Sequence, residues 1–128
     1  MNRRSFRSPL GRAIGLGSAK RGSRQWMAER VTAVALVPLS LWFVASIIAH
    51  ADSGYTIFIA WLRTPFAAGG MVLLLIALFY HAALGLQVVI EDYVHSGTKF
   101  AAVITVRLAC CGFAVIGIIA VLRVAFRS

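Results

Sequence analysis

Negative charge is scarce in this sequence: Asp and Glu together number 4 in 128 residues, and none of them precedes Glu29. All charged residues together make up 13% of the chain, about half of the roughly 25% found in average soluble domains. Hydrophobic residues make up 60%. This balance excludes an ordinary soluble domain and predicts a chain that places most of its residues in lipid.

Cysteine is equally sparse, with only Cys110 and Cys111, which are adjacent within an apolar run. Neighbouring cysteines rarely bridge, because the disulfide geometry strains the backbone between them. The spacing of paired metal ligands is also missing. We therefore expect two small apolar side chains here, and no disulfide framework or zinc site.

Positive charge is concentrated near the amino terminus, because most of the 13 Lys and Arg residues precede Val31. A basic segment beside a membrane span usually stays on the cytoplasmic side and contacts anionic lipid. A nucleic-acid interface is a poor alternative, because the rest of the chain offers no soluble domain to face bases. A mitochondrial presequence stays an alternative, since the segment is basic and has no acidic residue. We predict a basic cytoplasmic tail over residues 1–24 and a membrane domain over residues 25–128.

Three apolar segments are each long enough to cross a hydrocarbon core of about 30 Å. The sequence predicts membrane-spanning helices over about 28–50, 65–92 and 99–123. Residues 55–62 predict a short interfacial helix between the first two spans. The expected fold class is therefore an all-α membrane protein with three transmembrane helices and its amino terminus on the cytoplasmic or matrix side.

Local signals refine the helix ends and contacts. Thr64 is a candidate N-cap, with Pro65 in the first turn of the second span. Pro38 predicts a kink in the first span, and Gly69-Gly70 predicts a close approach of another helix. In the turn over residues 96–98, the glycine is a candidate C-cap for the second span and the threonine a candidate N-cap for the third.

The second span contains His81, and an ionisable side chain in hydrocarbon is costly unless it has a partner. A neutral imidazole is a common iron ligand, so His81 is a candidate axial ligand of haem b. The alternative is a histidine that is hydrogen-bonded to a neighbouring helix. Gly85, one turn later on the same face, leaves room for a flat macrocycle or a close helix. Because His50 and His95 lie near the ends of spans, a second histidine ligand would have to come from another chain.

Other polar residues suggest ligand contacts at the basic side of the membrane. Tyr93 can donate a hydrogen bond to a quinone carbonyl, and Asp92 can orient the tyrosine or pass protons. The alternative is an aromatic belt residue beside a helix-ending acid. Arg30 is a candidate partner of a haem propionate, or a plain membrane anchor. Arg107 either snorkels to the interface or turns inward to an anion.

Two segments carry a resemblance to a known family. They are Trp26-Met-Ala-Glu-Arg-Val-Thr-Ala33, followed by an apolar span, and His81-Ala-Ala-Leu-Gly-Leu-Gln-Val-Val-Ile-Glu-Asp-Tyr93. The chain resembles the smaller of the two hydrophobic membrane-anchor subunits of succinate dehydrogenase (respiratory complex II). The resemblance covers the three spans and part of the tail, and the His81, Asp92 and Tyr93 spacing is its most specific part.

The resemblance implies a helix bundle shared with a second membrane-anchor subunit, with one haem b between the two. Each of the two anchors would supply one histidine, here His81 as the axial iron ligand. Tyr93 would donate to ubiquinone with Asp92 beside it, and Arg30 would contact a propionate. Many relatives carry a histidine before the tryptophan junction, where this chain has Arg24-Gln25, which argues against a second polar haem contact there.

The resemblance also implies an iron–sulfur subunit and a flavoprotein subunit, both docked so that electrons from succinate reduce quinone. The anchor would then be non-catalytic alone and would lie in the cell inner membrane, with the mitochondrial inner membrane as the alternative. Other functions remain as alternatives. They are the anchor of a quinol:fumarate reductase or of a formate dehydrogenase, and a haem-free structural membrane protein.

Overall fold

The computed structural model describes residues 18–127, and these form four helices with no strand among them. The helices are α2 (Ser18–His50), α3 (Gly54–Leu62), α4 (Pro65–Tyr93) and α5 (Thr98–Phe126). Three of them, α2 from Gly22 onward and the whole of α4 and α5, are long and apolar enough to cross a membrane. The predicted all-helical fold with three spans is confirmed, and α3 is the predicted short helix.

The basic tail predicted over residues 1–24 is only partly covered by the described residues. Residues 1–17 lie outside them, and α2 begins at Ser18. The helix therefore starts seven residues before position 25 and includes part of the basic segment.

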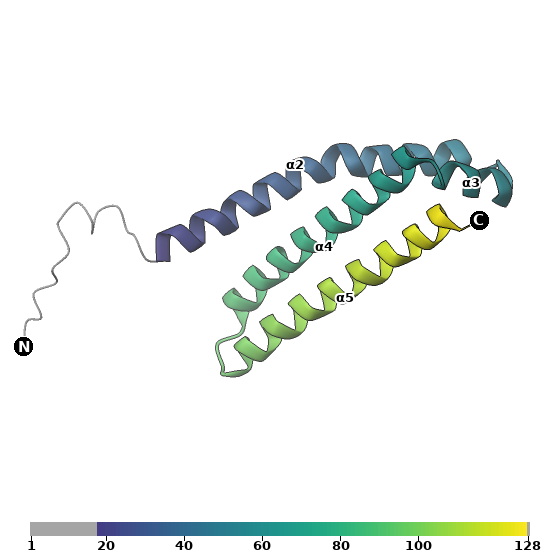
Figure 1. Cartoon of the computed structure of the whole chain (residues 1–128). Helices are drawn as coiled ribbons and strands as arrows, with labels where there is room; N and C mark the ends of the chain where they lie inside the picture. Colours follow the sequence, from purple (N-terminus) through teal and green to yellow (C-terminus); the bar gives the residue numbers. More distant parts are fainter. Residues whose placement is uncertain (1–17, 128) are drawn as a thin grey trace, which may run out of the picture.

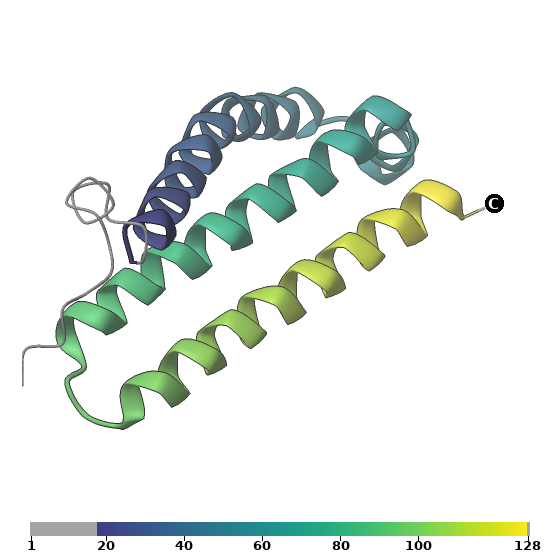
Figure 2. The ribbon, with the colours of Figure 1, turned by 60° about the vertical axis from the view of Figure 1, so that its left-hand side comes forward.

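Helix α4 is the central element of the molecule. It packs against α2 on one side and α5 on the other, whereas α2 and α5 do not contact each other. The two views show α2, α4 and α5 as an open row, with α3 at the end where α2 passes into α4 (Figures 1 and 2). The helix that carries His81 is thus the only one of the three spans with a neighbour on both sides.

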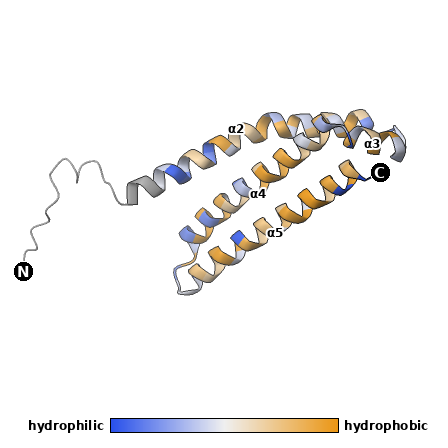
Figure 3. Cartoon of the chain, in the orientation of Figure 1, coloured by the Kyte–Doolittle hydropathy of each residue, from blue (hydrophilic) through white to orange (hydrophobic). Residues whose placement is uncertain are grey.

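The interior is small and apolar. Among residues 22–127, the buried residues are all hydrophobic, and alanines are prominent among them: Leu62, Ala67, Ala68, Leu74, Ala77, Leu84 and Val121. Hydrophobic residues recur along all three spans (Figure 3). Many of their side chains are exposed, including Val34 at 71% and Leu41 at 67%. Such a surface suits lipid or a partner helix and not water.

Contacts near α3 hold α2 and α4 together. A Cβ atom added to Gly70 would lie 2.7 Å from the Trp42 ring, so the close approach predicted at Gly69-Gly70 is confirmed at Gly70. The space beside Gly69 is open. Trp42 also contacts Trp61 and Phe66, with ring centroids 6.1 Å apart in both pairs. The small residue thus lets an aromatic side chain of α2 lie directly on α4.

The helix ends follow the local sequence only in part. The Thr64 hydroxyl accepts a hydrogen bond from the Ala67 N–H at 3.3 Å, with proline in the first turn, as predicted. The caps predicted in the 96–98 turn are wrong: Val94 caps α4, and Gly97 is the N-cap of α5. The extended backbone at Val94 ends the helix before the glycine is reached.

Helix α2 runs through Pro38 without a break. Proline has no N–H, so the Val34 carbonyl loses its usual partner four residues later, and the ring also crowds that carbonyl. Both views show α2 bending along its length (Figures 1 and 2), as this position predicts.

Candidate functional site

His81 lies on α4 and faces α2. Its Nδ1 atom is 3.0 Å from the hydroxyl oxygen of Thr32, a residue 49 positions earlier in the chain. The same hydroxyl is 2.7 Å from the Ala28 carbonyl oxygen and 3.1 Å from that of Glu29. The imidazole is therefore held against the backbone of the neighbouring helix through a single threonine side chain.

These contacts indicate which nitrogen of His81 carries the proton. A hydroxyl has one proton to donate, and a carbonyl oxygen can only accept. When the Thr32 hydroxyl donates to the carbonyls of its own helix, it accepts from His81, and Nδ1 is the N–H. In a neutral ring, Nε2 then carries the lone pair.

The lone-pair nitrogen is accessible. His81 is half-buried, and within residues 22–127 no hydrogen-bond partner of Nε2 is found. In that same range no buried polar side-chain atom lacks a partner, so Nε2 lies at the surface of the isolated chain. The bond to Thr32 matches the alternative role expected for His81, a bond to a neighbouring helix. It is also compatible with iron ligation, because it uses only one of the two nitrogens.

The surface next to His81 is open. Gly85 is exposed one turn further along α4, and a Cβ atom added there would meet nothing within 4 Å. The room predicted beside His81 is therefore present, and none of the four described helices fills it. His50 is far from this level: it lies 18 residues after Thr32 on α2, about 27 Å along the axis, with its ring 4.6 Å from that of Trp61.

Asp92 and Tyr93 form the last turn of α4, and both are exposed. Tyr93 has 81% of its surface accessible, and neither side chain has a hydrogen-bond partner among the side chains of residues 22–127. Twelve residues separate Tyr93 from His81, which is about 18 Å along the helix. The two candidate sites thus share a helix, and this chain alone does not enclose the tyrosine.

Arg30 lies two residues before Thr32 on α2, about 200° away around the helix, and therefore on the side away from α4. It is exposed, and its guanidinium carbon is 5.3 Å from the centroid of the Trp26 ring. This cation–π contact places the charge beside an aromatic residue typical of the membrane boundary. An anion that meets Arg30 must approach the outer face of α2.

A polar connection between α4 and α5 involves a residue without a predicted role, Gln87. Its carbonyl oxygen accepts from Arg107 Nε at 3.1 Å and Nη2 at 2.5 Å, and its amide donates to Glu91 at 2.8 Å. Arg107 therefore turns toward the neighbouring helix. The sequence carried a signal for this pair: Gln87 and Arg107 each lie ten residues from Gly97, in the turn between two antiparallel helices.

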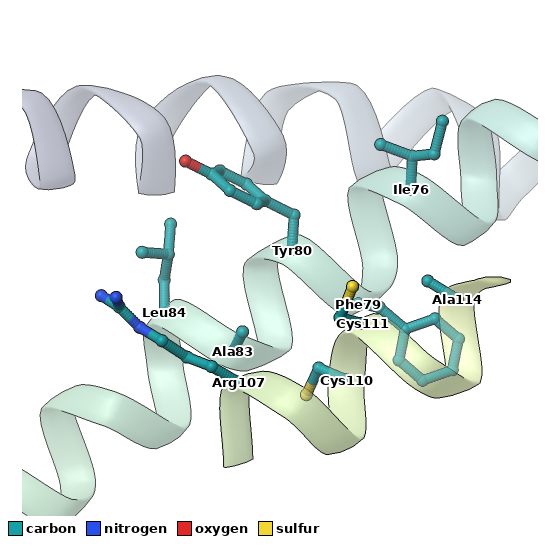
Figure 4. A pocket seen from close by; sticks show the side chains of 9 residues that line it. All are labelled: Ile76, Phe79, Tyr80, Ala83, Leu84, Arg107, Cys110, Cys111 and Ala114. Atoms are coloured by element: carbon teal, nitrogen blue, oxygen red, sulfur yellow. The ribbon is translucent and has the colours of Figure 1, made fainter. Parts of the chain in front are cut away.

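A groove of about 420 Å³ lies between α4 and α5, with Arg107 near one end and Phe79 near the other (Figure 4). Tyr80 and both cysteines also line it, and the cysteines are not bridged to each other. His81 is absent from the lining residues. The groove is therefore separate from the surface on which Nε2 of His81 lies.

Comparisons with known proteins agree with these features. The family described as "Succinate dehydrogenase/Fumarate reductase transmembrane subunit" matches residues 4–122 of this chain. The chain is 42% identical over 89 residues to the succinate dehydrogenase hydrophobic membrane anchor subunit of Rickettsia bellii, covering 70% of this chain and 71% of that protein.

Two other relatives have the same description. The protein of Rickettsia conorii is 33% identical over 107 residues, covering 82% of this chain and 85% of its own. The protein of Paracoccus denitrificans is 33% identical over 97 residues, covering 76% of this chain and 75% of its own. With three membrane-spanning helices and bacterial relatives, this is a multi-pass inner-membrane protein. The chain belongs to the family of transmembrane subunits of succinate dehydrogenase and fumarate reductase.

Proposed function

We propose that this chain anchors a succinate dehydrogenase in the membrane, supplies His81 as an axial ligand of haem b, and contributes Tyr93 and Asp92 to a ubiquinone site. The observation that carries the proposal is the state of His81. Its Nδ1 is bound within the chain while Nε2 keeps an accessible lone pair. Neutral imidazole with one nitrogen anchored is the usual form of a histidine ligand.

The residues around His81 fit a haem. Open space beside Gly85 suits a flat macrocycle, and Arg30 offers a cation that can pair with a propionate on the outer face of α2. The stacking of Arg30 on Trp26 suits membrane anchoring equally well. A bound haem b would supply a one-electron carrier between the other redox centres and the quinone.

A second membrane-anchor subunit is the proposed source of the opposite ligand. His50 is at another depth, and His95 lies in the exposed segment between α4 and α5. With an open row of helices and an apolar exterior, the chain has faces on which a second set of spans can pack. A bundle completed by two chains would enclose the haem between them.

The test of ligation is the substitution His81→Ala in the complete membrane complex. We expect the reduced b-type absorbance band to disappear, because alanine cannot coordinate iron. His95→Ala is the matched control, since that histidine is exposed outside the spans, and its band should be unchanged. A normal band in the His81→Ala complex would remove His81 from the site.

The quinone site is proposed at the end of α4. The exposed Tyr93 hydroxyl can donate to a quinone carbonyl, and Asp92 can orient it or pass protons. The exposure of both side chains on the last turn of α4 is consistent with a pocket completed by other subunits. Positive charge near the same end supports an orientation with the amino terminus in the cytoplasm.

The substitution Tyr93→Phe tests the quinone site. We expect slower quinone reduction, by about 5- to 30-fold if a bond worth about 1–2 kcal/mol is lost. Succinate oxidation with a soluble artificial acceptor should survive. Tyr55→Phe is the control, because Tyr55 is equally exposed, at 80%, but lies on α3. Loss of both activities in Tyr93→Phe would indicate failed assembly instead.

The finer assignment of partners follows from the same proposal. An iron–sulfur subunit and a flavoprotein subunit would dock on the cytoplasmic face, near the Tyr93 end of α4. The matched family includes fumarate reductase subunits as well. The relatives described as succinate dehydrogenase subunits favour that enzyme. Purification of the intact complex, followed by mass-spectrometric identification of its subunits, tests this assignment.

A further inference from the structure

We infer that Thr32 is a positioning residue for His81, whose hydroxyl fixes the tautomer, the orientation and the donor strength of the ring proposed to bind haem iron. This inference rests on the proposed ligation by His81. The proposed ligation gives Thr32 no role, and this inference adds one for that residue of α2.

Thr32 joins the ring to a rigid element. Its hydroxyl proton is shared between the carbonyls of Ala28 and Glu29, at 2.7 and 3.1 Å, and both belong to α2. The oxygen therefore has little freedom, and its remaining acceptor site is directed at His81 Nδ1, 3.0 Å away. Rotation of the imidazole out of this position would break the bond. The packing of α2 against α4 therefore sets the direction in which Nε2 points.

The same bond affects the electronic character of the ring. A hydroxyl that already donates to a carbonyl is a better acceptor, because hydrogen bonds in a chain polarise one another. A hydrogen bond from Nδ1–H to this oxygen makes Nε2 a stronger electron donor to a metal. A stronger donor stabilises ferric iron relative to ferrous iron. The threonine is therefore expected to lower the midpoint potential of the haem.

The experiment compares Thr32→Val and Thr32→Ser in the purified complex. Valine keeps the shape but removes the acceptor, and serine keeps the hydroxyl. We expect Thr32→Val to change the ferric-to-ferrous affinity ratio by up to about tenfold, an upward shift in midpoint potential of up to about 59 mV for one electron. The electron paramagnetic resonance signal of the ferric haem should also change as the ring reorients. Thr32→Ser should show the midpoint potential and the resonance signal of the unsubstituted complex.

Thr105→Val is the matched control. Thr105 is also a helical threonine whose hydroxyl donates to the carbonyl four residues earlier, Ala101, at 2.8 Å. It is exposed on α5, and its hydroxyl has no bond to a histidine among the described residues. Its replacement removes the same kind of backbone bond without touching His81. The potential and the spectrum should then match those of the unsubstituted complex.

The outcomes separate this inference from the proposal beneath it. An unchanged b-type absorbance band in the His81→Ala complex would overturn both the proposed ligation and this inference. If His81→Ala loses the haem band but Thr32→Val has the same midpoint potential and resonance signal as Thr105→Val, only the role of Thr32 is overturned. If the valine complex fails to assemble, Thr32→Ala takes its place, because it removes atoms and adds none. Failure of Thr32→Ser to restore the potential would likewise count against a role for the hydroxyl.

Discussion

Gly85 leaves open space on the face of α4 that carries His81. It shares a face of α4 with His81, since residues four apart are neighbours on a helix. No atom outside its own helix turn would meet a Cβ added there. A Cβ atom would therefore fit against the described residues without strain, and a longer side chain would extend into the space proposed for the haem.

We predict that Gly85→Leu lowers haem occupancy while the complex still assembles. Overpacking costs about 1–3 kcal/mol, which is a loss of about 5- to 150-fold in haem affinity. The ratio of haem absorbance to protein in the purified complex measures it. Gly112→Leu is the control, because Gly112 on α5 also has open space. Full haem occupancy in the Gly85→Leu complex would argue that the macrocycle lies elsewhere.

At the scale of elements, the packing of α2 on α4 sets the distance between Thr32 and His81. Near α3, the two helices meet through Trp42 and Gly70. The indole is confined by two further rings, those of Trp61 and Phe66. It cannot simply move aside when atoms are added to α4. Contacts at one end of the helix pair therefore influence the geometry at the middle.

We predict that Gly70→Ala destabilises the complex by about 1–3 kcal/mol, the usual cost of overpacking. The added Cβ would lie 2.7 Å from the Trp42 ring, which must shift against its neighbours. Thermal unfolding of the purified complex, followed by helical circular dichroism, measures the change. Gly69→Ala should have little effect, because the adjacent glycine has open space. Equal behaviour of the two variants would mean that the Trp42 contact is not rigid.

At the scale of the whole molecule, the three spans form an open row and not a closed bundle. The only helix with two neighbouring spans is α4, and none of the largest side chains is completely buried among the described residues. In lipid, helix association depends on close packing and hydrogen bonds, because the surroundings are as apolar as the side chains. Because the interior of this row is small, contacts within the chain supply little close packing and few hydrogen bonds between helices.

We therefore predict that the chain is unstable alone in detergent and becomes stable when it is produced with the second anchor. Size-exclusion chromatography with light scattering would show aggregates for the single chain and one defined species for the pair. A folded, monodisperse monomer of the single chain would contradict this expectation.

Much of the fold was accessible from sequence, because lipid leaves few choices for an apolar segment of some twenty residues. The candidate site was less accessible. His81 stood out as a charge-capable residue in an apolar run, whereas Thr32 has no feature that distinguishes it from other threonines in a helix. Gln87 could have been paired with Arg107 from their equal distance to the turn, a signal that needs the antiparallel arrangement as well as the sequence.

Hydropathy and charge act residue by residue, so the three spans, the basic end of the molecule and the histidine within the second span could be predicted from the sequence. The central place of α4, the contact between Thr32 and His81, and the exposure of Nε2 come from the tertiary structure. These features depend on how two residues 49 positions apart in the chain meet across a helix pair. Side-chain geometry between helices follows from packing, which no local pattern encodes.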